Sequence, residues 1–305
     1  MATGQLTYNF PGRYSFICPP DVTSVSVVCV GAGGKSSSSK GTDSVGGGGG
    51  GLGYKNNITV IPGNSYDVIV GSGGKFWGLY NKKTDGGDSY FISKETVSGL
   101  GGAGGIYGTP GVGGTYFGDG GGNGGAGGAA NSLQGGGGGA GGYSGNGGDG
   151  LSSASGSSGA GSGGAGGGGY QAGGGGVGII GEGSSGAAVS SGNSGKAGSV
   201  NTLQGLCGAD AQVPNETFLY VNSAGVSTSV TYKKPFRNGG LYGGGGGGCV
   251  LGGSGADGAV RIIWGDGRAF PSTNTADSGL GTVGITSTYN IFDWNYESPH
   301  QLYLR

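Results

Sequence analysis

The fold is decided by the stretch GLGGAGGIYGTPGVGGT, residues 99–115, and by its continuation to Gly208. Nearly half of residues 99–208 are glycine, and larger residues recur at every third position. The first run is Leu100, Ala103, Ile106, Thr109, Val112 and Thr115, and it is followed by Asn123, Ala126, Ala129 and Ser132. A third run is Ala140, Tyr143, Asn146, Asp149, Ser152, Ser155 and Ser158.

A period of three is the period of polyproline II, because α-helices repeat every 3.6 residues and strands every two. A polyproline II helix has no internal hydrogen bonds, so its backbone needs partners in other segments. With two glycines in many repeats, two faces of each helix can contact neighbouring backbones while the third carries a side chain. We therefore expect a bundle of short polyglycine II helices within residues 99–208.

A disordered glycine and serine linker is the alternative interpretation of the same composition. Two features favour the bundle. The three-residue phase persists through several segments, and aromatic and aliphatic residues such as Ile106, Tyr107, Ile179 and Ile180 interrupt the tract.

The flanking regions predict β-structure, with alternating or wholly apolar runs bounded by turn residues. We expect strands at residues 5–10, 14–17, 24–30, 57–61, 66–70, 89–93, 217–222, 227–233 and 259–264. The predicted fold is therefore all-β: a jelly-roll-like β-sandwich with glycine-rich insertions. Its expected parts are residues 1–98 plus 209–264 as a discontinuous sandwich, 99–208 as the polyglycine bundle, and 265–305 as an aromatic-rich tail.

The composition argues against most catalytic and nucleic-acid-binding classes. A net charge of −1, with 10% charged residues, gives no electrostatic basis for binding nucleic acid. The single histidine and four scattered cysteines predict neither a zinc site nor a Ser–His–Asp triad, and no disulfide is expected, although Cys29 and Cys249 could lie close if their strands pair. The P-loop-like run VCVGAGGKS, residues 28–36, lacks the first glycine of that motif. We expect no enzyme activity, metal or cofactor.

Secretion and membrane insertion are not expected either. No apolar run approaches the roughly 20 residues that a membrane span needs. Met1–Phe10 contains no basic region followed by an apolar core, so we expect no signal peptide.

Aromatic residues among small ones are the candidate binding residues, because rigid rings give contact area at low entropic cost. The candidates for receptor binding are Phe76, Trp77, Tyr80, Tyr107, Tyr116, Phe117, Tyr143 and Tyr170. Each ring has an alternative role, which is to cap the glycine bundle or its junction with the sheets.

Motifs at both ends of the chain resemble a known family. FPG at residues 10–12, PDVTSVSV at 20–27 and GAGG at 31–34 resemble the start of the glycine-rich domain of tailed-phage fibre and adhesin proteins. GGSGADGAVRIIWG at 252–265 is similar to that domain's closing strand, and GRAFPSTNT at 267–275 resembles cyanophage virion structural proteins. The resemblance implies a β-sandwich that carries polyglycine II helices, with receptor-binding loops at the tip in some phage adhesins.

The resemblance implies a non-enzymatic virion protein, assembled in the host cytoplasm, that binds the host surface as a tail-fibre or tip component. Its expected partners are a host glycan or outer-membrane protein, other virion proteins through residues 265–305, and further copies of itself. The chain lacks the fibrous shaft or coiled coil of trimeric fibres, which favours a short tip or decoration subunit. A purely structural capsid, neck or tail protein and a glycine-rich extracellular or cell-wall protein remain alternatives.

Overall fold

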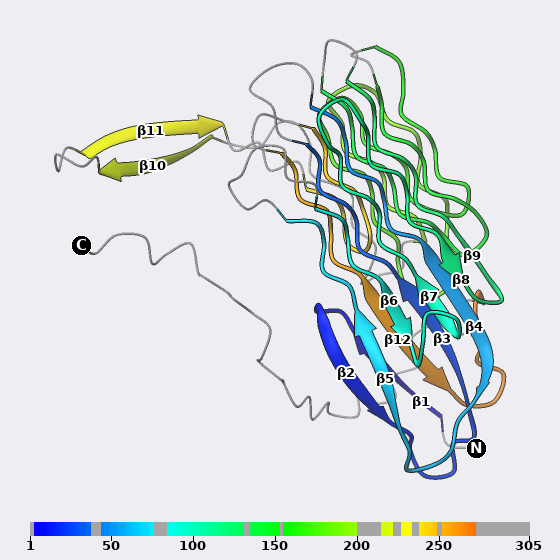
Figure 1. Ribbon diagram of the computed structural model, residues 1–305. Helices are drawn as coiled ribbons and strands as arrows, with labels where there is room; N and C mark the ends of the chain where they lie inside the picture. The colour runs from blue at the N-terminus through cyan, green and yellow to red at the C-terminus, as the bar shows by residue number, and fades with distance from the viewer. Residues whose placement is uncertain are drawn as a thin grey trace.

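Strands at one end of the molecule continue into glycine-rich segments at the other (Figure 1). The computed structural model describes residues 3–37, 44–75, 84–130, 134–152, 155–199, 215–221, 227–233, 238–248 and 252–272. Its strands are β1 (Gly4–Tyr8), β2 (Gly12–Ile17), β3 (Ser24–Val30), β4 (Leu52–Thr59), β5 (Ser65–Val70), β6 (Ser89–Phe91), β7 (Val97–Gly99), β8 (Tyr116–Phe117), β9 (Gly120–Gly122), β10 (Asn215–Val221), β11 (Ser227–Lys233) and β12 (Ala259–Trp264). Within these residues the chain contains no helix, as the all-β prediction requires.

The strands form two five-stranded antiparallel sheets and one two-stranded sheet. The first has the order β1-β12-β3-β4-β9, the second β2-β5-β6-β7-β8, and β10 pairs with β11. The last expected strand, β12, lies between β1 and β3, so the two ends of the described β-structure are neighbours in one sheet. We call the two five-stranded sheets together the β-domain.

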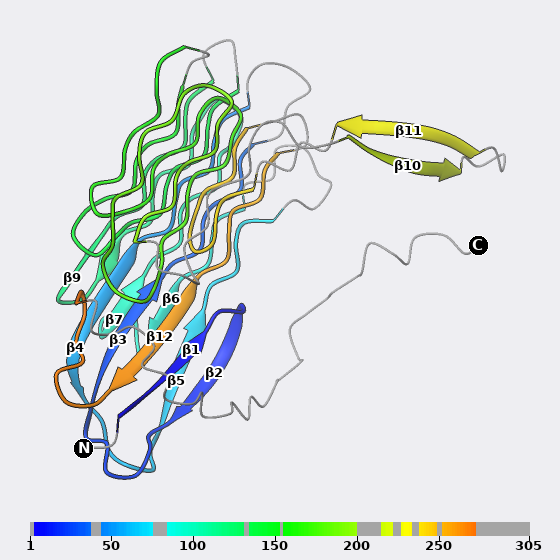
Figure 2. The ribbon, with the colours of Figure 1, turned by 180° about the vertical axis from the view of Figure 1, so that it is seen from behind.

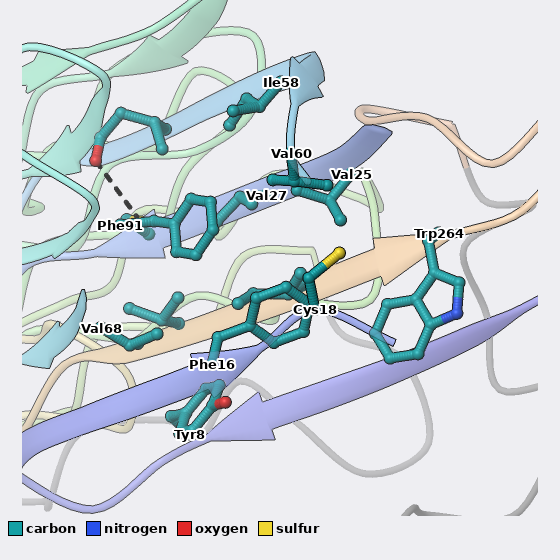
Figure 3. Packing of buried hydrophobic residues seen from close by; sticks show 14 of the residues in the cluster. Tyr8, Phe16, Cys18, Val25, Val27, Ile58, Val60, Val68, Phe91 and Trp264 are labelled. Carbon is teal, nitrogen blue, oxygen red and sulfur yellow. Dashed lines mark hydrogen bonds between the residues drawn. The ribbon is translucent and has the colours of Figure 1, made fainter. Parts of the chain in front are cut away.

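A hydrophobic core lies between the two sheets of the β-domain (Figure 3). Strand β3 contributes Val25, Val27 and Cys29 to this core, and the second sheet contributes Phe16, Val68 and Phe91 among others. Phe16 lies between Phe91 and Trp264, with ring centroids 5.9 Å from each. The rings give the core much of its buried apolar area, which is the main driving force for folding.

A second core covers the outer face of the first sheet. Val28 and Val30 point away from the inter-sheet core and pack with Ile179, Tyr143 and other residues of the glycine-rich region. Strand β3 is thus apolar on both faces, as expected for a central strand. The β-domain and the glycine-rich region therefore share this second core.

The glycine-rich segments lie side by side and together form what we call the glycine array. Its described segments are residues 31–37, 44–51, 71–75, 84–88, 100–115, 123–130, 134–152, 155–199, 239–248 and 252–258. The array thus takes segments from outside residues 99–208, and β8 and β9 inside that range pair with β-domain strands. The division of the chain at residues 98 and 208 stays a prediction.

The central segment of the array, residues 46–51, is hydrogen-bonded to six neighbouring segments. Its N–H groups donate to three of these segments, and each segment accepts at two carbonyls that are three residues apart. Gly46 and Gly49 donate to Gly128 and Gly125, respectively. In the same way, Gly47 and Gly50 donate to Gly246 and Gly243, and Gly48 and Gly51 donate to Ala103 and Leu100. Its carbonyl groups accept in the same order from Gly111 and Gly114, from Gly138 and Gly141, and from Gly34 and Gly31. All of these N···O distances lie between 2.7 and 3.0 Å. Every backbone polar group of this buried segment is therefore satisfied without a sheet.

Close backbone contact explains why the central segment is glycine. A Cβ built on Gly49 would lie within 3.0 Å of the Gly139 carbonyl, and one built on Gly46 would meet the Gly136 carbonyl as closely. Neither glycine has a positive φ in the left-handed region, so backbone freedom is not the reason. The close packing of neighbouring backbones leaves no room for a side chain.

Candidate functional site

The turns of the glycine array lie at its two ends, one next to the β-domain and one away from it (Figures 1 and 2). Most glycine-rich segments leave a strand, run away from the β-domain and turn back, as both views show (Figures 1 and 2). We call the end away from the strands the distal end. Side chains on distal turns can reach a partner without involving the β-domain.

Tyr107 lies on a distal turn and is exposed. The turn joins the segment that follows β7 to the segment that precedes β8, and Ile106 and Thr109 close it with reciprocal backbone hydrogen bonds of 3.0 and 2.7 Å. Gly108 has a φ of +74°, a conformation that glycine adopts without strain. Tyr107 is 56% exposed at the tip of this short, hydrogen-bonded turn.

Tyr170 lies on another distal turn and is half-buried. Ala172 N–H donates to the Gly169 carbonyl across the turn, and Gln171 N–H donates to the Gln134 carbonyl of a neighbouring segment. The Gln171 side-chain amide donates to the Tyr170 hydroxyl at 2.8 Å. Two independently formed turns thus place tyrosines at the distal end.

Tyr116 and Phe117 form β8, at the edge of the second sheet, and not a distal turn. Their side chains are 36% and 49% exposed. They lie where the glycine array meets the β-domain, because the glycine-rich segment 111–115 leads directly into β8.

Tyr143 is buried in the second core, so its ring lies at the junction between the glycine array and the first sheet. It is 2% exposed and lies parallel to Phe270, with ring centroids 5.9 Å apart, and it also contacts Tyr54. Burial raises the pKa of its phenol, and Gly181 N–H donates to its oxygen at 3.2 Å. Binding of a partner by Tyr143 would require this core to open.

The remaining three candidates, Phe76, Trp77 and Tyr80, lie outside the described residues. The same holds for Cys249, while Cys29 is a free, buried thiol.

Polar side chains at the margins of the array accept hydrogen bonds from outward-facing backbone N–H groups. Asn146, Asp149 and Ser152 accept from the N–H groups of residues 123, 126 and 129, at 3.0, 2.7 and 2.9 Å. The spacing is three residues on both segments, so one row of side chains covers one row of donors. We call side chains of this kind edge caps.

A second pair of edge caps consists of Asp88 and Asp85, which accept from the N–H groups of Gly101 and Gly104 at 2.8 and 2.7 Å. Asp88 also pairs with Lys94, and this contact raises the pKa of the lysine. Aspartate is common in glycine-rich turns, so the sequence alone did not identify these two carboxylates as caps. The three-residue spacing was the signal that could have found them.

Metal-ligating side chains are not clustered in the described part of the chain. No group of three or more His, Cys, Asp or Glu side chains among them could hold a metal ion. Two buried cationic side chains donate to neutral oxygens: Lys35 to the Ser36 carbonyl at 2.9 Å, and Arg261 to the Ile179 carbonyl and the Gln5 side chain at 3.2 and 2.6 Å. The same residues include no helix that could cross a membrane.

The chain has two antiparallel sheets whose strands continue into a hydrogen-bonded glycine array. This architecture defines a class of all-β, glycine-rich protein. A family described as a glycine-rich domain matches residues 8–265, and the chain belongs to this family. Comparison with curated proteins gave no significant match.

Proposed function

We propose that the protein is a non-enzymatic structural protein of a phage particle that contacts the host surface through its distal turns. The observation that carries this proposal is the position of Tyr107, exposed on a hydrogen-bonded turn at the end away from the β-domain. A rigid support that presents aromatic side chains lowers the entropic cost of binding. The resemblance of the terminal motifs to tail-fibre and virion proteins supports the phage context.

The support beneath these turns is, in this proposal, a bundle of polyglycine II helices attached to a β-sandwich. The three-residue period of the backbone hydrogen bonds and the six neighbours of residues 46–51 support this conformation. Lateral bonding in all directions would make the bundle stiff, so that the turns move with the β-domain.

The opposite end of the molecule would attach to the particle. Residues 265–272 pack on the first sheet, where Phe270 contacts Tyr54 and Tyr143 and exchanges backbone hydrogen bonds of 2.9 and 2.7 Å with the Asn56 side chain. This anchored segment leads into residues 273–305, which we propose contact another virion protein. A host glycan or outer-membrane protein would then meet the distal end.

Competition for adsorption tests the binding role. Host cells are incubated with purified, folded protein before the phage is added, and free phage is counted. Excess wild-type protein should lower adsorption, Tyr107→Ala should compete less well, and Ile61→Ala should compete like the wild type. Ile61 is a matched control because it is 59% exposed on the β4–β5 turn, at the other end of the molecule.

Unchanged adsorption at saturating wild-type protein would contradict the host-binding role and leave a purely structural particle protein. Mass spectrometry of purified particles tests the virion assignment separately. Absence of the chain from particles would favour a glycine-rich extracellular protein.

A further inference from the structure

The stretch of chain from the distal turn at Ile106 to the end of β8 is apolar and uncharged. Five of the ten exposed large hydrophobic side chains of the described residues lie on the hairpin of residues 106–117: Ile106, Tyr107, Val112, Tyr116 and Phe117. Val112 is the most exposed of all ten, at 69%. No charged residue occurs between residues 99 and 118. We call these five residues the apolar edge.

The backbone beneath the apolar edge has only part of the hydrogen bonding seen at the centre of the array. Segment 111–115 donates from Gly111 and Gly114 to one neighbour, and the carbonyls of the same two glycines accept from a second. The carbonyls of Val112 and Thr115 accept from a third neighbour. This segment therefore bonds to three neighbours, whereas residues 46–51 bond to six.

Segment 111–115 has further backbone groups that bond to none of these neighbours, and they include N–H donors and one carbonyl acceptor. Within the described part of the chain, nothing accepts from the N–H groups of Val112, Gly113 and Thr115, and nothing donates to the carbonyl of Gly113. Val112 and Thr115 are exposed residues three positions apart, so their N–H groups repeat with the period of the array. A partner segment with carbonyls at the same period would extend the array by one layer.

Two other margins of the array carry edge caps. Asp85 and Asp88 cover the donors of Gly101 and Gly104, and Asn146, Asp149 and Ser152 cover those of the segment 123–129. Polar and charged residues on an exposed edge prevent further pairing, in the way that charged side chains protect the edge strands of sheets. In the described part of the chain, no side chain caps the N–H groups of Val112 and Thr115.

We propose that two copies of this chain associate through segment 111–115 of the apolar edge, with this segment of each copy against the other. A second copy supplies an uncharged apolar row and the unbonded Gly113 carbonyl, so an N–H group of each copy can donate to the Gly113 carbonyl of the other. Apolar area leaves water when the two rows meet, and the absence of charge avoids repulsion. The pairing is isologous, since the same patch serves both copies.

Sedimentation velocity of the full chain across a concentration series tests this proposal. The wild type should associate reversibly, and Val112→Asp should raise the dissociation constant by about tenfold or more, because two new carboxylates would face each other. Ile61→Asp places the same charge on a comparably exposed residue at the other end and should leave association unchanged. Thr115→Lys, also on an exposed residue, is a second variant if Val112→Asp does not fold, as judged by its melting temperature.

Hydrogen exchange gives a local readout on the same samples. Peptides that contain residues 112–115 should exchange more slowly as protein concentration rises, and those around Ile61 should not change. A wild type that stays monomeric from about 1 to 100 µM would overturn the proposal. So would association that Val112→Asp and Thr115→Lys leave intact.

Discussion

A single methyl group added inside the glycine array should destabilise the protein. Gly127→Ala would place a Cβ within 3.0 Å of the Gly46 carbonyl oxygen, which accepts the hydrogen bond of Gly111 N–H at 2.9 Å. Overpacking a filled interior costs about 1–3 kcal/mol, and loss of one buried hydrogen bond costs about 1 kcal/mol more. Replacing glycine by alanine offsets at most about 1 kcal/mol through the unfolded chain. The expected net loss is about 2 kcal/mol.

Ala126→Ser is the matched control for Gly127→Ala, because it also adds one heavy atom and lies one residue away. Ala126 is half-buried at the margin, where Asp149 accepts its N–H. Urea and thermal unfolding should place the Gly127→Ala midpoint about 4–8 °C below the wild type, while the control stays within about 2 °C. A Gly127→Ala variant as stable as the wild type, or more stable, would refute the reasoning and restore the interpretation of a flexible linker.

Three further predictions concern single side chains. Asp149→Ala should lower the unfolding free energy by about 1 kcal/mol, because the hydrogen bond from Ala126 N–H is lost. Asp149→Asn keeps an acceptor oxygen and should lower the unfolding free energy less. Urea unfolding of both variants measures the difference, and equal losses would contradict a capping role. Cys18 and Cys29 are buried free thiols whose pKa values are raised by burial, so they should react with an alkylating reagent at pH 8 only after unfolding; modification of the native protein, followed by mass spectrometry, would contradict this. Burial and the neighbouring Tyr14 raise the pKa of Tyr8 to about 12, so the contribution of Tyr8 to the unfolding free energy should be constant below about pH 10 and fall as the pH rises towards 12; Tyr8→Phe should show a shallower fall, and identical profiles would contradict the assignment.

The strands of the β-domain were largely predictable from the sequence. The expected strands 24–30 and 259–264 match β3 and β12 residue for residue, because both are mostly apolar runs that end at a glycine. Strand β4 begins at Leu52, five residues before the expected start at residue 57, because Gly53 and Tyr54 pair with β9. The short strands β7, β8 and β9 were missed, since two or three residues give no usable periodicity.

The period of three was visible in the sequence, but the identity of the neighbouring segments was not. Residues 46–51 contact backbones from six places in the chain. Glycine carries no side chain that could specify which segment becomes a neighbour. Among the candidate site residues, Tyr107 replaces a glycine of the repeat and lies on the turn closed by Ile106 and Thr109, which explains its exposure. The burial of Tyr143 was not predictable, because it depends on Tyr54 and Phe270 from distant parts of the chain.

Hydrogen exchange of the backbone N–H groups in residues 46–51 tests the central claim most directly. Each of these N–H groups donates to a backbone carbonyl at 2.7–3.0 Å and is buried. If lateral hydrogen bonds hold the glycine array together, peptides covering this segment should exchange as slowly as those covering β3 in the core of the β-domain. Exchange of residues 46–51 at the rate of an unstructured glycine-rich peptide, while β3 stays protected, would contradict the account.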